Sequence, residues 1–505
     1  MPLYVLRLSL EHLSFRLPSL LSISQVFGFK IKFVSEDPYR GLLVVEVAKE
    51  EDINHILERD TLIQSATELY AQGTSYEELQ TELRGKLDVL KPYENSTFKF
   101  TLESTNHRVP ESRAVEVIET FEFTGLKGKI RLKDPEVEFV IFEDYDWEVA
   151  STVDARYERD GKFKYVFFGR RIGFGTARHL TLSHAVKDRA YYGNTAMDAL
   201  MGFLMAGQAL PAPGKLIYDP FVGTGSMLYA VAHWGAYVIG SDIDGRQMRG
   251  KMKGKNVRPG ILRAAAQYGT EDKFLDCLTY DVTRSPIRRG GWIDAIITDP
   301  PYGVRAGAKR LGRKEGKKPQ REEPYMFPDG TYSHKRPEYL PPSRPYELAN
   351  LCLDLILLAR YLLVPKGRLV FFLPTVNEDW QEIDIPKVEG MRELKVGEGS
   401  VQDFGKWGRR LITMEKTAVD DGLPPTFEDH DEFDLKSGPE YLPGHHGFNK
   451  RYASGFSSRH KSQTASPASD RDPSSSEHQA APPAKNGLEA TASLAAALEK
   501  TGLAE

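Results

Sequence analysis

Cysteine is the scarcest residue in this sequence: only Cys277 and Cys352 occur among 505 residues. The two lie far apart in the chain, which excludes a disulfide framework, a CxxC zinc site and an iron–sulfur cluster. We therefore expect two reduced thiols in an intracellular protein, and no metal site.

The chain also lacks an apolar run long enough to cross a membrane. Its longest run, Leu351–Leu363, is interrupted by Asp354 and Arg360. Residues 1–31 mix apolar side chains with charged ones such as Glu11, and they lack the pattern of a secretory signal. We expect a soluble protein of the cytoplasm or nucleus, with the cytoplasm as its assigned location and no membrane partner.

Neither sign of charge dominates, because 67 Lys and Arg stand against 71 Asp and Glu, for a formal net charge of -4. A nucleic-acid partner therefore cannot be inferred from total charge and would need a local basic patch. With 40% hydrophobic residues, the chain is long enough for two or three domains with real cores.

The first 175 residues contain short helical and strand-like patterns. Apolar residues three to four positions apart predict helices at 52–58 and 75–90. Strands are predicted at 42–47, 97–102, 136–143 and 164–169. We expect a small mixed unit over 1–50, an α+β domain over 51–175 and a linker over 176–190.

A different pattern begins near Tyr191, where strand-like runs alternate with helical ones. Strands are predicted at 215–218, 237–240, 274–278, 293–297 and 368–373. Helices are predicted at 226–234, 246–253 and 345–363. This alternation predicts an α/β domain over 191–416 with a doubly wound parallel sheet, whose ligand binds at the carboxyl ends of the strands.

Two segments fall outside these domains. Residues 305–321 carry eight Lys or Arg and one Glu, without apolar periodicity. Residues 417–505 are rich in Ser, Pro, Ala and Gly and cannot bury enough surface to offset chain entropy, which predicts a disordered tail. Within that tail, 488–498 has the composition of a transient helix.

The segment LIYDPFVGTGS runs from a predicted strand through a glycine turn into a predicted helix. Gly223 and Gly225 let the backbone approach a ligand, and the helix start offers free N–H groups to a carboxylate. Asp242, after the next strand, suits a ribose diol, and Asp281, after the following one, could reach an adenine amino group. The alternative is an ordinary α/β turn with solvated acids. The string DPFVGTGS resembles motif I of S-adenosylmethionine-dependent methyltransferases, whereas a nicotinamide site would want a third glycine where Leu228 stands.

A second motif, Asp299-Pro300-Pro301-Tyr302, follows the predicted strand WIDAIIT. Asp299 offers a side-chain oxygen and Pro300 a carbonyl oxygen. Acceptors aimed at both hydrogens of an exocyclic base amine direct its lone pair at a methyl donor, and Tyr302 can stack on the base. A structural proline turn is the alternative. The motif resembles the [DN]PP[YFW] motif of amino-methyltransferases acting on adenine, cytosine or guanine, so it indicates the reaction type without the base, which must be exposed or flipped.

The stretch DRAYYGNTAMDALMGFLM at 188–205, with the DPFVGTGS and DPPYGVR strings after it, resembles the tRNA guanine-N2 methyltransferases that act on the guanosine at position ten. The residues that match the family's R-x-Y-x-G-x-T-x-M-D segment are Arg189, Tyr191, Gly193, Thr195, Met197 and Asp198. The resemblance is strong over about 185–305 and extends in architecture over about 1–416. It implies a ferredoxin-like part and a THUMP RNA-binding domain ahead of a class I (Rossmann-like) methyltransferase domain. It also implies tRNA and a small zinc-binding activator subunit as partners.

The same resemblance assigns site residues. Those that it implies for binding S-adenosylmethionine are Thr195, Met197, Asp219, Phe221, Gly223, Gly225, Asp242 and Asp281. Those that it implies for the target guanine are Asp299, Pro300, Pro301 and Tyr302. Ala196 stands where the family more often has serine, so no hydroxyl contact is carried over there.

The basic run is a candidate for binding tRNA phosphates, and a solvated charged loop is the alternative. The residues that we assign to this role are Arg305, Lys309, Arg310, Arg313, Lys314, Lys317 and Lys318. Arg170 and Arg171 are weaker candidates.

Two rival functions stay open on the sequence: an amino-methyltransferase acting on rRNA or DNA, and a non-catalytic RNA-binding scaffold. The glycine turn and the DPPY motif together argue against a scaffold, which needs neither. We predict direct in-line methyl transfer without a covalent enzyme intermediate, because neither cysteine lies in a motif suited to attacking a base.

Overall fold

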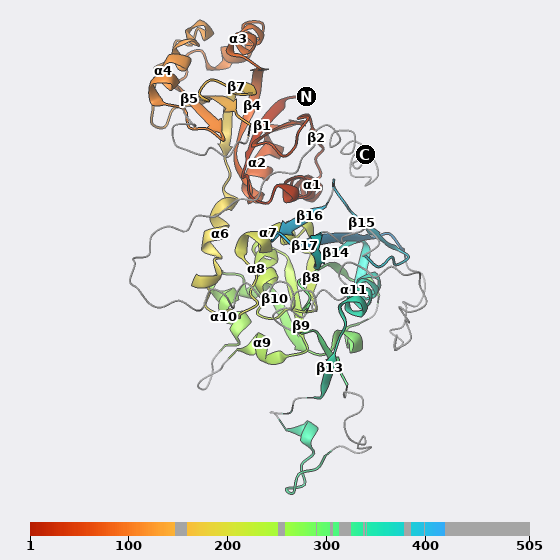
Figure 1. The fold of residues 1–505 in the computed structure, drawn as a ribbon. Coiled ribbons are helices and arrows are strands. Elements are labelled where there is room, and N and C mark those ends of the chain that lie inside the picture. The colour runs from red at the N-terminus through yellow and green to blue at the C-terminus, as the bar shows by residue number, and fades with distance from the viewer. Residues whose placement is uncertain are drawn as a thin grey trace, which may run out of the picture. The chain divides into compact units, whose positions relative to one another are not determined.

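The computed structural model describes residues 1–146, 159–250, 258–288, 290–302, 307–312, 325–336, 339, 341–377, 385–397 and 399–419. These residues form two compact units, the first mainly Met1–Ser183 and the second beginning at His184 (Figure 1). Apart from residues 417–419, the predicted tail with its helix at 488–498 lies outside the described residues.

One seven-stranded sheet runs through the first unit, in the order β2-β3-β1-β4-β7-β6-β5. Its strands are β1 (Leu3–Leu8), β2 (Ile31–Phe33), β3 (Leu42–Val47), β4 (Ile63–Gly73), β5 (Phe98–Thr105), β6 (Val137–Asp144) and β7 (Tyr165–Phe174). Neighbouring strands are antiparallel except β5 and β6, which are parallel and are joined through α4 (Glu111–Glu119). The boundary predicted near residue 50 falls inside this sheet, so the two predicted parts share it.

Two separate cores form where helices cover this sheet. Leu20 of α1 (Arg16–Phe27) and Ile53 of α2 (Glu50–Arg59) pack with apolar residues of β1, β3 and β4. Leu79 of α3 (Tyr76–Arg84) packs into an aromatic core with residues of β5, β6 and β7, among them Phe139 and Phe168.

Helix α3 begins and ends at residues that suit those positions. The N-cap Ser75 accepts a hydrogen bond from the Glu78 N–H, and the Glu78 carboxylate accepts one from the N–H of Thr74, the residue before the N-cap. The helix ends at Gly85, and a 3₁₀ turn follows at Leu87–Tyr93. The single helix predicted over 75–90 is therefore two shorter elements.

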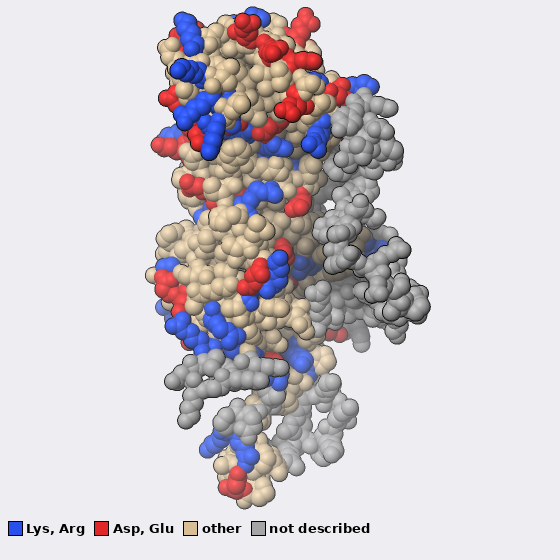
Figure 2. Space-filling view, turned by 90° about the vertical axis from the view of Figure 1, so that its left-hand side faces the viewer, with Lys and Arg blue, Asp and Glu red and all other residues tan. Residues whose placement is uncertain are grey.

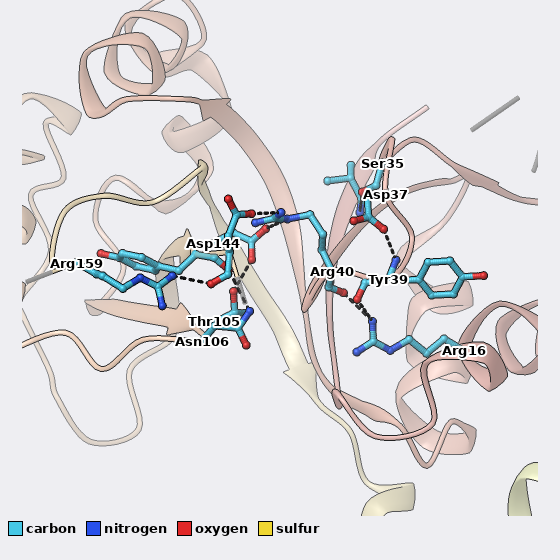
Figure 3. A network of polar contacts seen from close by, with 12 residues as sticks. Arg16, Ser35, Asp37, Tyr39, Arg40, Thr105, Asn106, Asp144 and Arg159 are labelled. Atoms are coloured by element: carbon cyan, nitrogen blue, oxygen red, sulfur yellow. Dashed lines mark hydrogen bonds and ion pairs between the residues drawn. The ribbon is translucent and has the colours of Figure 1, made fainter. Parts of the chain in front are cut away.

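Buried charges connect the strands of the first unit (Figure 3). Arg40 donates from Nε to Asp144 at 2.5 Å and from Nη1 to Asp146 at 2.6 Å. Thr105 donates its hydroxyl to the other oxygen of Asp144. The fully buried Arg16 donates to the Arg40 carbonyl oxygen at 2.7 Å. The network ties the segment between β2 and β3 to the ends of β5 and β6.

The second unit contains an eight-stranded sheet, in the order β10-β9-β8-β11-β14-β17-β15, with β16 also paired to β17. Its strands are β8 (Leu216–Asp219), β9 (Tyr237–Asp242), β10 (Phe274–Thr279), β11 (Ile293–Thr298), β14 (Leu363–Val376), β15 (Met391–Glu393), β16 (Ser400–Asp403) and β17 (Trp407–Lys416). The first five strands in this order are parallel, which confirms the predicted α/β fold. The antiparallel extension by β15, β16 and β17 was not predicted.

The helices of this unit are α7 (Ala199–Gln208), α8 (Ser226–His233), α9 (Gly245–Arg249), α10 (Gly260–Gln267) and α11 (Leu348–Leu362). Leu351 and Leu355 of α11 pack with apolar residues of β8, β11 and β14. The helix predicted over 246–253 ends earlier, because Gly250 has a φ of 67°. Residues 251–253 lie outside the described residues.

The middle of the basic run forms a strand. Residues Lys309–Leu311 (β12) pair antiparallel with Ser343–Pro345 (β13). The expectation that the run stands outside the folded structure is therefore wrong for these three residues. The same pairing explains why the helix predicted from Pro345 begins only at Leu348, since Pro345 belongs to a strand.

Candidate active site

Acidic residues gather at one edge of the second sheet. Asp219 ends β8, Asp242 ends β9 and Asp299 follows β11. Because these strands are parallel neighbours, their carboxyl ends lie at the same edge. Thr298, the last residue of β11, connects β11 to β8 by donating its hydroxyl to Asp219 Oδ1 at 2.6 Å. The glycine turn and the DPPY motif thus adjoin in space.

The glycine turn between β8 and α8 has a backbone that favours glycine. The φ angle is 50° at Gly223 and 83° at Gly225. Among the described residues, a Cβ at Gly223 would meet only the Phe221 carbonyl oxygen, at 4.0 Å, so it would project into open space. Asp242 Oδ2 accepts from the Gly223 N–H at 3.0 Å, and its Oδ1 accepts from the Asp244 N–H at 2.8 Å. Each Asp242 oxygen keeps a lone pair for a further donor.

Asp219 is fully buried and only half satisfied. Its Oδ1 accepts from the Phe221 N–H at 3.0 Å and from Thr298. Its Oδ2 has no hydrogen-bond partner among the described residues, and burial raises the pKa of this carboxyl to about 7. Such an oxygen costs free energy until a donor reaches it.

Asp299 has the same one-sided arrangement. Its Oδ2 accepts from Arg409 Nη1 at 3.1 Å, whereas its buried Oδ1 has no partner in the part of the chain that the structure describes. Burial raises the pKa of Asp299 to about 6, against the opposing effect of the Arg409 cation. The next residue, Pro300, is buried and lacks an N–H, so it contributes a carbonyl acceptor alone. This edge offers acceptors to a ligand rich in N–H donors.

Arg409 on β17 is the candidate that sequence reasoning missed. Its Nη1 also donates to the Tyr302 hydroxyl at 3.2 Å, and its Nη2 lies 3.7 Å from the Met197 sulfur. Gln402 Oε1 accepts from its Nε at 3.0 Å. The guanidinium carbon lies 4.6 Å from the Phe372 ring centroid, within cation–π range. Arg409 therefore contacts both the DPPY motif and the segment before α7.

No motif marks Arg409 in the sequence, where it stands 110 residues after Asp299. It reaches the site because β17 is antiparallel to β14, which places the start of β17 at the carboxyl edge, with Arg409 opposite Pro374. Only the strand order and direction could have revealed it.

The segment before α7 is bound to the start of α8. The Met197 N–H donates to Ser226 Oγ at 3.1 Å, and Arg189 Nη1 donates to the same oxygen at 2.9 Å. Asp198 caps α7 by accepting from two backbone N–H groups. Arg189 and Asp198 thus hold the local fold. Met197 is buried and Thr195 is exposed, and their predicted contacts with a cofactor stay predictions.

Asp281 is buried and already accepts hydrogen bonds from several donors. Its Oδ1 accepts from the N–H and the hydroxyl of Thr283, each at 2.9 Å, and its Oδ2 accepts from the Leu311 N–H at 2.5 Å. The carboxylate therefore ties β12 to the segment after β10. An adenine amino group would have to share these oxygens, and that role stays a prediction.

The two cysteines are not prepared for nucleophilic chemistry. Burial raises the pKa of both the Cys277 and the Cys352 thiol to about 12. The thiolate is the reactive form, so both are inert near neutral pH. This agrees with the prediction of transfer without a covalent enzyme intermediate.

The basic residues assigned to tRNA are only partly described. Lys309 is exposed, and the Arg310 guanidinium lies 5.8 Å from the Tyr346 ring centroid. Those outside the described residues are Arg305, Arg313, Lys314, Lys317 and Lys318. In Figure 2 most of the visible face carries neither charge, and Lys or Arg side chains appear beside Asp or Glu side chains in several places, in keeping with the balanced composition.

The two weaker candidates are bound by carboxylates within the first unit. Arg170 pairs with Glu50 and with Glu68, and Arg171 pairs with Glu103. These contacts favour a structural role for both arginines.

Within the described ranges, no helix is long and apolar enough to cross a bilayer, and no group of three His, Cys, Asp or Glu is arranged to hold a metal ion.

Comparison with known proteins identifies the family. Residues 2–177 match the family model described as the Tmrp11 THUMP N-terminal domain, and residues 187–314 match the RMKL-like methyltransferase domain. The tRNA (guanine(10)-N(2))-methyltransferase TRMT11 of Mus musculus is 33% identical over 470 residues, which cover 90% of this chain and 96% of the mouse protein. This chain belongs to the tRNA (guanine(10)-N(2))-methyltransferase family.

Fungal members of the family are equally similar. The tRNA (guanine(10)-N(2))-methyltransferase of Saccharomyces cerevisiae is 34% identical over 413 residues, covering 81% of this chain and 92% of the yeast protein. That of Schizosaccharomyces pombe is 31% identical over 498 residues, covering 90% of this chain and 97% of its own length. The family resemblance inferred from the motifs is confirmed, and so is the THUMP assignment, which no sharp motif had supported.

Proposed function

We propose that this chain transfers a methyl group from S-adenosylmethionine to the exocyclic N2 amine of the guanosine at position ten of tRNA. The observation that carries the proposal is the acceptor pair of the DPPY motif, with Asp299 Oδ1 lacking a partner among the described residues. The names of the curated relatives support tRNA and position ten.

S-adenosylmethionine fits the residues present at the sheet edge. The open space at Gly223 and the N-terminus of α8 suit its carboxylate. Asp242 would accept from the ribose diol, and Asp219 Oδ2, which lacks a partner among the described residues, would accept from the ammonium group. The remaining residues proposed to line the cofactor site are Gly225, Phe221, Thr195, Met197 and Asp281.

When bound, S-adenosylmethionine supplies a methyl group on a positively charged sulfur. Asp299 and the Pro300 carbonyl oxygen accept the two amine hydrogens, which directs the nitrogen lone pair at that methyl group. Asp299 would take the proton that the amine nitrogen loses once it has accepted the methyl group that the bound cofactor would supply. Arg409 donates a hydrogen bond to Asp299 and to the Tyr302 hydroxyl, which holds the two side chains close together, and Tyr302 stacks on the base.

The partners follow from the same proposal. The THUMP region and the basic run, Lys309 included, bind tRNA, and the protein works in the cytoplasm, where it encounters tRNA. The family resemblance further implies a small zinc-binding activator subunit, whose presence is tested by co-purification and by its effect on methyl transfer.

The decisive experiment is transfer of labelled methyl from S-adenosylmethionine to unmodified tRNA, with and without the activator subunit, followed by nucleoside analysis. We expect labelled N2-methylguanosine, and we expect it to disappear when the guanosine at position ten is replaced. Label only in rRNA or DNA would assign a different amino-methyltransferase. No cofactor binding, even with the activator, would indicate a scaffold.

A further inference from the structure

Arg409 places a hydrogen-bond donor next to the amine acceptor of the candidate active site. Its Nη1 is 3.1 Å from Asp299 Oδ2 and 3.2 Å from the Tyr302 hydroxyl. On its other side, Gln402 Oε1 accepts from both Nε and Nη2. The guanidinium is therefore fixed by one glutamine and by the DPPY motif itself.

Part of the hydrogen-bonding capacity of Arg409 is weakly used. Its Nη2 faces the Met197 sulfur at 3.7 Å, and a thioether is a weak acceptor. Its Nη1 donates to the Tyr302 hydroxyl at 3.2 Å, and a carbonyl oxygen of the base can replace this hydroxyl as the acceptor. A carbonyl oxygen arriving at this point would gain a charge-assisted hydrogen bond.

The Watson–Crick edge of guanine carries the exocyclic amine, the N1–H donor and the O6 acceptor in that order. The site carries the complementary order. Asp299 Oδ1, which lacks a partner among the described residues, is a first acceptor, Asp299 Oδ2 is a second, and the Arg409 guanidinium, 3.1 Å from Oδ2, is a donor beside them. Two acceptors followed by a donor fit two donors followed by an acceptor.

We propose that Arg409 determines the specificity for guanine, by donating to O6 while the two oxygens of Asp299 accept from the amine and from N1–H. This inference rests on the proposed function and names the base that the amino-methyltransferase site accepts. Adenine and cytosine have an amine next to a ring nitrogen that carries a lone pair. That lone pair would face Asp299 Oδ2, acceptor against acceptor, so the same pair of side chains rejects both bases.

The test compares two tRNAs that differ in one atom. Methyl transfer by the full chain is measured on tRNA with guanosine at position ten and on the same tRNA with 6-thioguanosine, which keeps the amine and N1–H but has sulfur in place of O6. The wild type should prefer guanosine by at least about tenfold in kcat/KM, because sulfur is the weaker acceptor. Arg409→Met should lower kcat/KM on guanosine about 100-fold and bring the preference close to one.

Arg410→Met is the matched control, because it removes the same charge from the neighbouring position, whose side chain points to the opposite face of β17. It should leave the guanosine preference unchanged. Arg409→Lys keeps the charge without the forked donor geometry and should show an intermediate preference. It also serves as the test variant if Arg409→Met does not fold, as judged by thermal unfolding and cofactor binding.

The outcomes separate this inference from the proposed function. If the wild type methylates guanosine ten but shows no preference over 6-thioguanosine, or if a folded Arg409 variant loses both activities equally, Arg409 does not read O6 and the inference is overturned. If the wild type methylates no guanosine in tRNA at all, the proposed function itself is wrong.

Discussion

Glu143 in the first unit is fully buried and Asp299 in the second is largely buried, but the two carboxylates differ in how they are satisfied. Glu143 accepts from the Tyr76 and Tyr145 hydroxyls at 2.5 and 2.7 Å and from Arg113 through both oxygens. Asp299 accepts from Arg409 on one oxygen, and its other oxygen has no partner among the described residues.

The difference separates structural charge from functional charge. A buried carboxylate whose oxygens are all bonded within the chain stabilises the fold and has little capacity left for a ligand. One left half satisfied costs stability in the empty protein and gains from the arrival of a donor. Asp144, bonded to Arg40 and Thr105, belongs to the first kind, and Asp219 belongs to the second.

The largest expected effect comes from removing the functional charge. Asp299→Asn should lower kcat at least about 100-fold, because an amide turns an acceptor for the amine into a donor. Cofactor affinity, measured by calorimetry, should stay within about twofold. The exposed Asp272 provides the control, since Asp272→Asn removes a carboxylate from the same unit and should change neither quantity. Loss of cofactor binding by Asp299→Asn would mean that its role is misassigned.

Removing the structural carboxylate Glu143 should lower the stability of the protein and leave its chemistry unchanged. Glu143→Ala should lower the free energy of unfolding of the first unit by about 3 kcal/mol, because Arg113 and two tyrosines lose their acceptor. Denaturant titration measures this loss. Cofactor affinity of the second unit should be unchanged wherever the protein is folded, and a parallel loss of cofactor affinity would contradict the division of roles.

Acidification should lower activity while it stabilises the empty site. Because the pKa of Asp299 is raised to about 6, kcat/KM should fall about tenfold per pH unit below that value, as the protonated form cannot accept from the amine. Since the pKa values of Asp219 and Asp299 in the folded protein lie above the ordinary value for an aspartate, their contribution to stability is greatest at low pH and is lost as pH rises through about 6 to 7.

The control for this pH dependence is Asp299→Asn, which has no group titrating at that position. At saturating S-adenosylmethionine, where protonation of Asp219 no longer limits cofactor binding, its residual activity should lack the acidic limb that begins near pH 6, and its free energy of unfolding should rise less on acidification than that of the wild type. An unchanged acidic limb in this variant would assign the titration to another group.

The smallest expected effect separates backbone strain from ligand contact. Gly223→Ala and Gly214→Ala both place a Cβ at positive φ, 50° and 83° respectively, and each should cost about 1 kcal/mol of stability. Gly223→Ala alone should weaken S-adenosylmethionine binding, by about tenfold, because its Cβ projects into the proposed cofactor space. Equal cofactor affinities in the two variants would remove Gly223 from the site.

Much of the second unit could be predicted from local pattern. The strands ending in Asp219, Asp242 and Thr298 are short apolar runs, and each ends where a charged or turn-forming residue begins. Less of the first unit could be predicted. The sequence did not predict β4, although it has eleven residues. Polar and apolar side chains mix along it, and register shifts in its pairing with β1 and with β7 break the alternation of exposed and buried positions.

The sequence by itself determined the reaction class and the position of the two motifs, because a glycine turn after a strand and a DPPY string depend on residues close together in the chain. It also determined the family, through the segment before α7. The tertiary structure decided which carboxylate oxygens lack a donor among the described residues, because that depends on contacts such as Thr298 with Asp219. It also decided that Arg409 joins the site, because only an antiparallel β17 brings a residue 110 positions away to Asp299.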